Sequence, residues 1–203
     1  GGTNHDITIG GNWYQNKNTS FQARSGKVMF NGSSAQTITS RSNFNTLRIY
    51  NSDVSLLRAA TVNGTLRIFS GATLDINGYN LTAETLNNAG NLQLKGTETL
   101  TITTKDTDSG TITYDGSATG LKYGNTYYNL AINSPSGTMT LSADLDINGS
   151  LTIADGTLNT GNNDMSVAGS WTNSGSFISG TGKVTFDGTS DIVTGGTGDS
   201  NDF

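Results

Sequence analysis

The sequence contains no cysteine, one histidine and one proline among its 203 residues, and each scarcity excludes a class of protein. Without cysteine there are no disulfides and no thiolate chemistry. A single histidine excludes a metal site built from several imidazoles of one chain. No apolar run approaches the roughly 18 residues that a membrane-spanning helix needs. We therefore expect no insertion into a membrane.

Charge is also scarce, since only 13% of the residues are charged and the net charge is −5 with a pI near 4.6. This acidic balance argues against a nucleic-acid partner. The 11 Lys and Arg residues are spread along the chain without a visible cluster, and several aspartates stand at Asp-Gly or Asn-Gly corners, where turn geometry explains them. We find no catalytic constellation, so we expect a protein that is not an enzyme and holds no cofactor. A β-helix polysaccharide-degrading enzyme is the less favoured option.

Small polar residues fill the chain instead. Gly (27), Thr (32), Asn (23) and Ser (22) together supply 104 of the 203 residues. Such a composition borders on that of disordered proteins, but the high net charge or abundant proline of disordered chains is missing. The composition therefore indicates a folded chain with many turns.

Long phrases recur along the sequence. Residues 61–68 (TVNGTLRI) match 146–153 (DINGSLTI) at an offset of 85, and a Lys-Val-Met-Phe-Asn-Gly phrase at 27–32 returns in related form at 111–116 and 183–188. We interpret the chain as about two and a half copies of a unit of about 80 residues, at 1–80, 81–165 and 166–203. The start has neither an initiator Met nor the pattern of a signal peptide, which indicates a processed chain or a fragment. Because the last copy is only about half a unit, we expect a slice of a longer array, and the alternative is a complete protein with a diverged duplication.

Apolar and polar residues alternate in short runs such as Leu151-Thr152-Ile153 and Val184-Thr185-Phe186. Alternation of this kind, ended by Asn-Gly or Asp-Gly, predicts short strands that are half-buried on one face. We find no amphipathic helix, because Gly breaks nearly every window. The favoured architecture is an all-β parallel β-solenoid, a single domain of about ten coils with about 20 residues each, or about 50 Å in length at the usual strand spacing. The alternative is an antiparallel β-sandwich.

The phrases at 128–133, 145–153, 169–177 and 184–188 resemble the β-strand repeats of very large bacterial and archaeal surface proteins. Those repeats are broadly similar to filamentous-haemagglutinin and autotransporter-passenger solenoids. The resemblance implies a right-handed parallel β-helix that is secreted to the cell surface. It also implies a structural role as an adhesin stalk, an extracellular filament or a matrix fibre.

The two ends of the sequence are candidate assembly edges. The first strand, 6–9, and the last, 191–194, have no obvious cap, and exposed strand edges recruit further strands. We therefore expect Ile7, Ile9, Ile192 and Val193 to lie at edges that stack end to end. The partner would be a second copy in a head-to-tail filament or a neighbouring repeat of the same long chain.

Tyr123, Tyr127 and Tyr128 form a small aromatic cluster. Exposed aromatic rings could stack on sugar rings, which would make the protein a glycan-binding adhesin module with a polysaccharide partner. Because Tyr127 aligns with Phe44 of the preceding copy, a repeated core position is favoured over this glycan-binding face.

The segment 105–110 (KDTDSG) resembles an acidic calcium loop, with Asp106 and Asp108 as weak candidate ligands. A calcium loop of the EF-hand type needs further oxygen ligands and a distal Glu, which are missing. A polar turn between two Thr-rich strands is therefore favoured, and we expect no metal.

Overall fold

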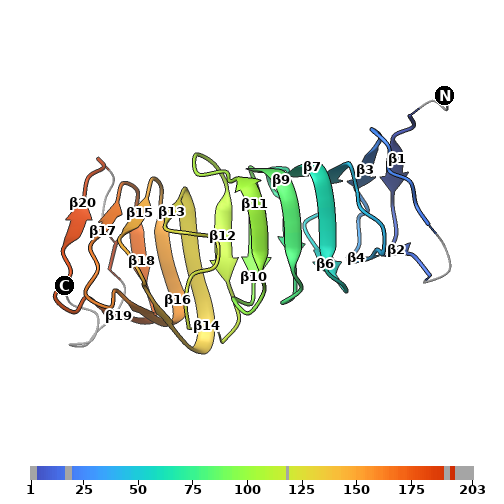
Figure 1. The fold of residues 1–203 in the computed structure, drawn as a ribbon. Helices are drawn as coiled ribbons and strands as arrows, with labels where there is room; N and C mark the ends of the chain where they lie inside the picture. Colours follow the sequence, from blue (N-terminus) through green and yellow to red (C-terminus); the bar gives the residue numbers. More distant parts are fainter. Residues whose placement is uncertain (1–3, 17–19, 118, 190–192, 195–203) are drawn as a thin grey trace. The chain divides into compact units, whose positions relative to one another are not determined.

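A computed structural model describes residues 4–16, 20–117, 119–189 and 193–194. In these residues the chain is all β-structure without a helix, and it winds as a parallel β-solenoid of about nine turns (Figure 1). The predicted solenoid is confirmed. The antiparallel sandwich is excluded, because every strand pairing in the described residues is parallel.

The chain divides into two compact units, residues 1–93 with 98–110 (unit 1) and residues 94–97 with 111–203 (unit 2). Unit 1 contains two ladders of stacked strands. The first ladder is β1 (Ile7–Ile9), β3 (Lys27–Phe30), β5 (Thr46–Ile49), β7 (Ala60–Ile68), β9 (Leu81–Asn88) and β11 (Leu100–Thr104). The second is β2 (Trp13–Tyr14), β4 (Gln36–Thr39), β6 (Val54–Leu56), β8 (Thr73–Asp75) and β10 (Asn91–Leu94), the last residue of which counts with unit 2.

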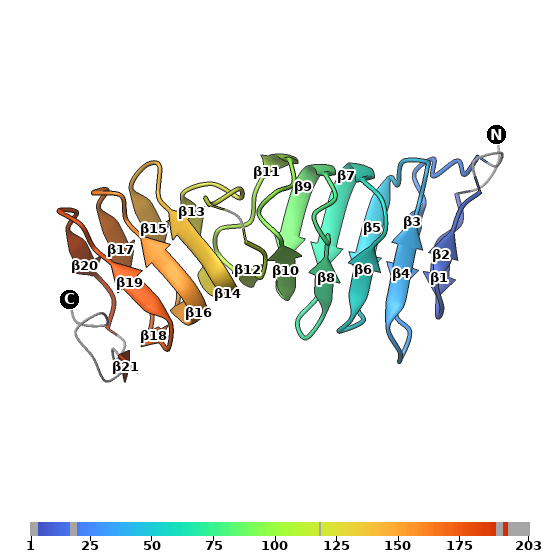
Figure 2. The same cartoon turned by 90° about the horizontal axis from the view of Figure 1, so that it is seen from below.

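Unit 2 is built in the same way, and Figure 2 shows its strands side by side. One ladder is β12 (Thr111–Tyr114), β14 (Asn129–Thr140), β16 (Leu151–Asn159), β18 (Trp171–Asn173) and β21 (Val193–Thr194), with β19 (Ser176–Ile178) beside the second half of β16. The other is β13 (Thr126–Tyr127), β15 (Leu145–Ile147), β17 (Met165–Val167) and β20 (Val184–Phe186).

One coil holds about 20 residues, as the alternating pattern predicts. Paired residues are 19 apart in the chain at Val28 and Leu47, and 20 apart at Leu151 and Trp171. Along β3 and β5 each buried side chain is followed by a partly exposed one. A single coil of this kind cannot enclose its own apolar face, so each coil is stabilised by stacking on the next.

Inward-facing side chains form columns along the first ladder of unit 1 and the ladder of unit 2 that begins at β12. The first column consists of Val28, Leu47, Leu66 and Leu86 in unit 1, and of Ile112, Leu130, Leu151 and Trp171 in unit 2. The members of the two sets differ in number by 84, 83, 85 and 85. The sequence repeat therefore corresponds to four coils.

A second column repeats at the same offsets. It consists of Phe30, Ile49, Ile68 and Asn88 in unit 1, and of Tyr114, Ile132, Ile153 and Asn173 in unit 2. The side chains of Asn88 and Asn173 are both buried, so even the polar end of this column is kept in the second unit.

Corresponding glycines allow the coils to approach closely. A Cβ atom on Gly90 would lie 2.4 Å from the carbonyl oxygen of Ala72, and one on Gly175 would lie 2.5 Å from that of Gly156. Both approaches are too short for any other residue, which explains why both copies keep glycine at this corner.

Candidate functional site

The β1 strand presents a strand edge. In the part of the chain that the structure describes, β1 pairs with β3 alone, through Ile7 beside Val28 and Ile9 beside Phe30. The carbonyl of Ile9 accepts the backbone N–H of Asn31, with an N···O distance of 3.2 Å. Because successive residues of a strand direct their backbone groups to opposite sides, the N–H and C=O of Thr8 point away from β3. These two groups are available to a further strand.

An ion pair holds β1 to the next coil. Nζ of Lys27 lies 3.3 Å from the carboxylate of Asp6, and the backbone N–H of Lys27 donates to the same carboxylate. These contacts, the backbone hydrogen bond first, lower the pKa of the Asp6 carboxyl. Since both side chains are exposed to water, the pair orients β1 more than it stabilises the fold.

The other candidate edge lies at β21, which pairs with β18 through Val193 beside Thr172. Val193 belongs to this strand, whereas Ile192 falls outside the described residues. The ladder that ends in β21 is the one whose columns correspond to the ladder of β1.

The tyrosine cluster is not the glycan-binding face that the sequence offered as an alternative. Tyr123 and Tyr127 are fully buried, and only Tyr128, 37% exposed, reaches the surface. The centroids of the two buried rings lie 5.6 Å apart in the core. Their faces are covered by protein, so two of the three candidate rings cannot stack on a sugar.

Tyr114, which sequence reasoning did not single out, organises this cluster. Its hydroxyl oxygen accepts the backbone N–H groups of Lys122 and Tyr123, at 2.7 and 2.8 Å, and lies 3.2 Å from the hydroxyl of Tyr127. Burial, reinforced by the neighbouring Tyr114, raises the pKa of Tyr127 well above 10.0. The cluster is therefore a hydrogen-bonded part of the core.

Asp106, one of the two weak calcium candidates, serves as the hydrogen-bond acceptor of a turn. One carboxylate oxygen accepts the backbone N–H of Asn88 at 2.6 Å and the hydroxyl of Ser109 at 2.9 Å, and the other accepts two further backbone N–H groups. Burial alone would raise the pKa of Asp106, but these hydrogen bonds together lower it. The pKa of Asp108 is raised, first by a side-chain hydrogen bond with Asp106 and then by repulsion from the charge of Asp106. These hydrogen bonds hold the polar turn that the sequence favoured for this segment.

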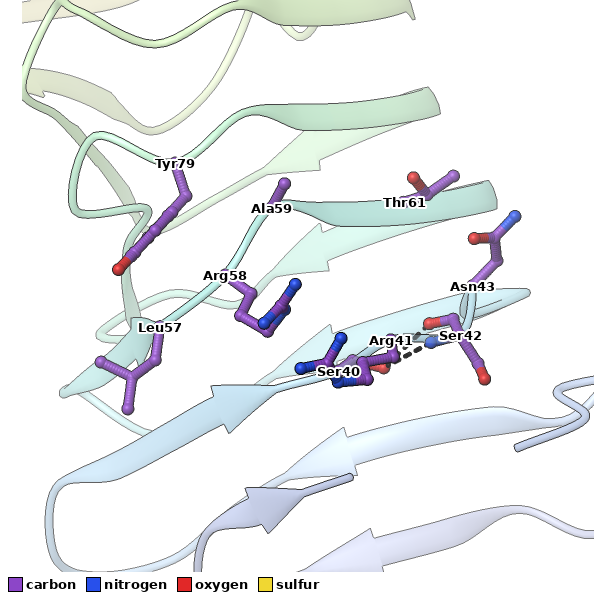
Figure 3. Close-up of a pocket in the computed structure, with 9 residues that line it drawn as sticks. All are labelled: Ser40, Arg41, Ser42, Asn43, Leu57, Arg58, Ala59, Thr61 and Tyr79. Carbon is purple, nitrogen blue, oxygen red and sulfur yellow. Dashed lines mark hydrogen bonds between the residues drawn. The ribbon is translucent and has the colours of Figure 1, made fainter. Parts of the chain in front are cut away.

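A hollow of about 540 Å³ lies where unit 1 turns from its second ladder into its first. It is lined by residues 40–43, by 57–59 and Thr61 on the next coil, and by Tyr79 on the coil after that. Figure 3 shows the guanidinium groups of Arg41 and Arg58 entering the space between these segments. We call this site the basic hollow, because its lining contains two arginines and no carboxylate.

Gln15 fixes the turn that carries Arg41. Its buried amide oxygen accepts the backbone N–H groups of Arg41 and Ser42, at 2.9 and 3.0 Å, and the hydroxyl of Ser40. Its amide nitrogen donates to Oγ of Ser42 at 2.8 Å. The turn is therefore held before any ligand arrives, which lowers the entropic cost of binding.

Sequence reasoning missed the basic hollow because Arg41 and Arg58 are 17 residues apart in a chain that showed no basic cluster. One signal was present: all five arginines fall between positions 24 and 67. A spacing near the coil length places residues on neighbouring coils, so two arginines that are distant in sequence meet at one corner.

In the described ranges, no three His, Cys, Asp or Glu side chains gather in a way that could hold a metal ion. The same ranges contain no helix that is long and apolar enough to cross a membrane. No protein-family model, curated protein or solved structure matches the chain.

Proposed function

We propose that the chain is a structural segment of an extracellular filament or stalk, extended by stacking further β-coils on its edges. The observation that carries this proposal is the edge at β1, where the N–H and C=O of Thr8 point away from the only strand that pairs with β1 in the described residues. Backbone groups at such an edge are a template for another strand.

The ladders support the same proposal. The column that begins at Val28 is rebuilt from Ile112 onward with apolar side chains at each coil, so a four-coil unit can follow another without a new kind of core. Because the two edges are formed by different strands, β1 and β21, stacking of one copy on the next would be a heterologous, open assembly. A neighbouring repeat of the same chain would use the same edges.

The extracellular location is part of the proposal and rests on the resemblance of the repeats to those of large surface proteins. Antibodies against the purified chain, applied to intact cells of the source organism, test it. Labelling of intact cells supports a surface location, and labelling only after the cells are broken contradicts it.

Substitution of Thr8 tests the edge. Thr8→Pro removes the outward N–H, while proline is tolerated where a strand faces no partner. Thr8→Val is the matched control, because it keeps the N–H and a β-branched side chain. We expect the wild type and Thr8→Val to associate as concentration rises in sedimentation velocity, and Thr8→Pro to remain monomeric with an unchanged circular dichroism spectrum. Equal association of the two variants would contradict the proposal.

A further inference from the structure

We propose that the basic hollow of unit 1 binds an acidic saccharide, that is, a sugar chain that carries carboxylate or sulfate groups. The site is separate from the strand edges, so this inference goes beyond the filament or stalk proposed above and does not depend on it.

The charge of the hollow points to an anion. Arg41 and Arg58 enter the same space from neighbouring coils (Figure 3). In the described part of the chain neither guanidinium group has an ion pair or a side-chain hydrogen bond. Two cations held together without a counter-ion repel each other, so a bound anion relieves that repulsion. Guanidinium groups also bind carboxylate and sulfate oxygens through paired hydrogen bonds.

The remaining lining points to a sugar. Tyr79 and Leu57 are 39% and 43% exposed, and both side chains lie at the hollow. An exposed aromatic ring offers an apolar face with a polar tip, which suits the C–H face of a sugar. Hydroxyl and amide side chains at Ser42, Asn43 and Thr61 supply partners for sugar hydroxyls.

The hollow has the form that an extended chain needs. Its walls come from three successive coils, which are about 4.8 Å apart. A second hollow of about 370 Å³ shares Ser42 and Asn43 with it and has Arg24 on its wall. Arg24, Arg41 and Arg58 thus lie on three consecutive coils along one corner. This arrangement fits several linked sugar residues better than a single small anion.

A nucleic acid fits less well, although it is also a polyanion. Nucleic-acid sites neutralise many phosphates with a broad basic surface. Unit 1 has eight Lys and Arg against seven Asp and Glu, a net charge of only +1. The positive charge is therefore local to the corner, which favours a ligand with spaced anionic groups.

Isothermal titration calorimetry with defined oligosaccharides tests the proposal. The probes are an oligogalacturonate, which carries carboxylates, a sulfated dextran oligosaccharide and neutral dextran of the same length. We expect one or both acidic probes to bind the wild type, with an affinity that falls as salt is added, and neutral dextran not to bind. Preference between the two acidic probes identifies the anionic group. Failure of both to bind overturns the proposal.

Variants locate the site. Arg41→Gln with Arg58→Gln should weaken binding about a hundredfold, or about tenfold for each charged hydrogen-bonding group. Arg48→Gln with Arg67→Gln is the matched control, since it removes the same charge from the strands β5 and β7 of the same unit. Thermal unfolding checks that both variants fold, and Tyr79→Ala should weaken binding without changing its salt dependence. Equal loss in the two double variants, or equal binding of single-stranded DNA by the wild type, would overturn the assignment.

Discussion

Phe30 and Phe44 in unit 1 stand where Tyr114 and Tyr127 stand in unit 2, and all four side chains are fully buried. In unit 1 the chain after β3 forms β4, whose backbone groups are paired within a ladder. In unit 2 the backbone N–H groups of Lys122 and Tyr123 find their acceptor in the hydroxyl of Tyr114. A side-chain oxygen can therefore replace the backbone of a neighbouring strand as the hydrogen-bond partner of a coil's backbone.

A second corner differs in a similar way. In unit 1 the buried amide of Gln36 donates to the carbonyls of Ile9 and Gly11 and accepts from the backbone of Gly32 and the side chain of Asn51. In unit 2, Ser134 stands in the place of Asn51 and donates directly to the carbonyl of Gly116, the counterpart of Gly32. The corner in unit 1 is held by the long amide side chain of Gln36, and the corner in unit 2 by the short hydroxyl side chain of Ser134.

The units also differ in charge. Unit 1 has a net charge of +1, whereas unit 2 has three Lys and Arg against nine Asp and Glu, a net charge of −6. All five arginines lie in unit 1, so an acidic ligand has a site there and meets repulsion at unit 2.

Of the substitutions considered, removal of Trp171 should change the stability of the protein most. Trp171 is fully buried in unit 2 against Phe177 and Phe186, with ring centroids 4.8 and 5.7 Å away. Trp171→Ala should lower the free energy of unfolding by about 3–5 kcal/mol, because it leaves a large cavity. Hydrogen exchange should show lost protection in β16 and β18. Equal loss of protection in β5 and β7 would show that the two units unfold together.

Gln36→Ala should cost at least about 2 kcal/mol, because several buried polar groups lose their partner. Ser134→Ala in unit 2 should cost only about 1 kcal/mol, since a single hydrogen bond is lost. Urea denaturation of the two variants measures the difference. A larger loss for Ser134→Ala would contradict the roles assigned to these corners.

Tyr114→Phe gives unit 2 the residue type that unit 1 has at the corresponding position, Phe30. It should lower the free energy of unfolding by about 1–3 kcal/mol, because the backbone N–H groups of Lys122 and Tyr123 lose the hydroxyl as acceptor. Phe30→Tyr, the reverse exchange, should also destabilise, because it brings a hydroxyl into an apolar place in the core. If Tyr114→Phe left stability unchanged, the hydroxyl would not be the support of this segment.

Alkaline pH should produce the smallest effect. The pKa of Tyr127 is raised above 10.0 in the folded protein, so the folded state keeps the proton that the unfolded chain has released. This contribution to stability is complete below pH 10.0 and is lost as the pH rises towards the folded pKa. Unfolding midpoints between neutral and alkaline pH should therefore fall less steeply in Tyr127→Phe than in the wild type. Identical slopes would show that Tyr127 does not titrate in this way.

Much of the fold could be predicted from the sequence. Alternation in runs such as Leu151-Thr152-Ile153 fixes which side chains face inward, and the offset of 85 between related phrases reveals units of several coils. Burial of Tyr127 followed from its alignment with Phe44, because a repeated position keeps its place in the core.

The sites were less predictable, because they depend on which corners of different coils meet. Arg41 and Arg58 belong to separate turns, and only stacking brings them into one hollow. Asp106 accepts the backbone N–H of Asn88 on the preceding coil, and no motif near Asp106 in the sequence predicts this contact. The partner of Tyr114 is the backbone of a segment without a strand, which lies outside any alternating pattern.

Negative-stain electron microscopy across a concentration series tests the central claim, that the strand edges extend the solenoid. The account predicts particles that join end to end into fibres as concentration rises. Particles that stay single at every concentration would contradict it.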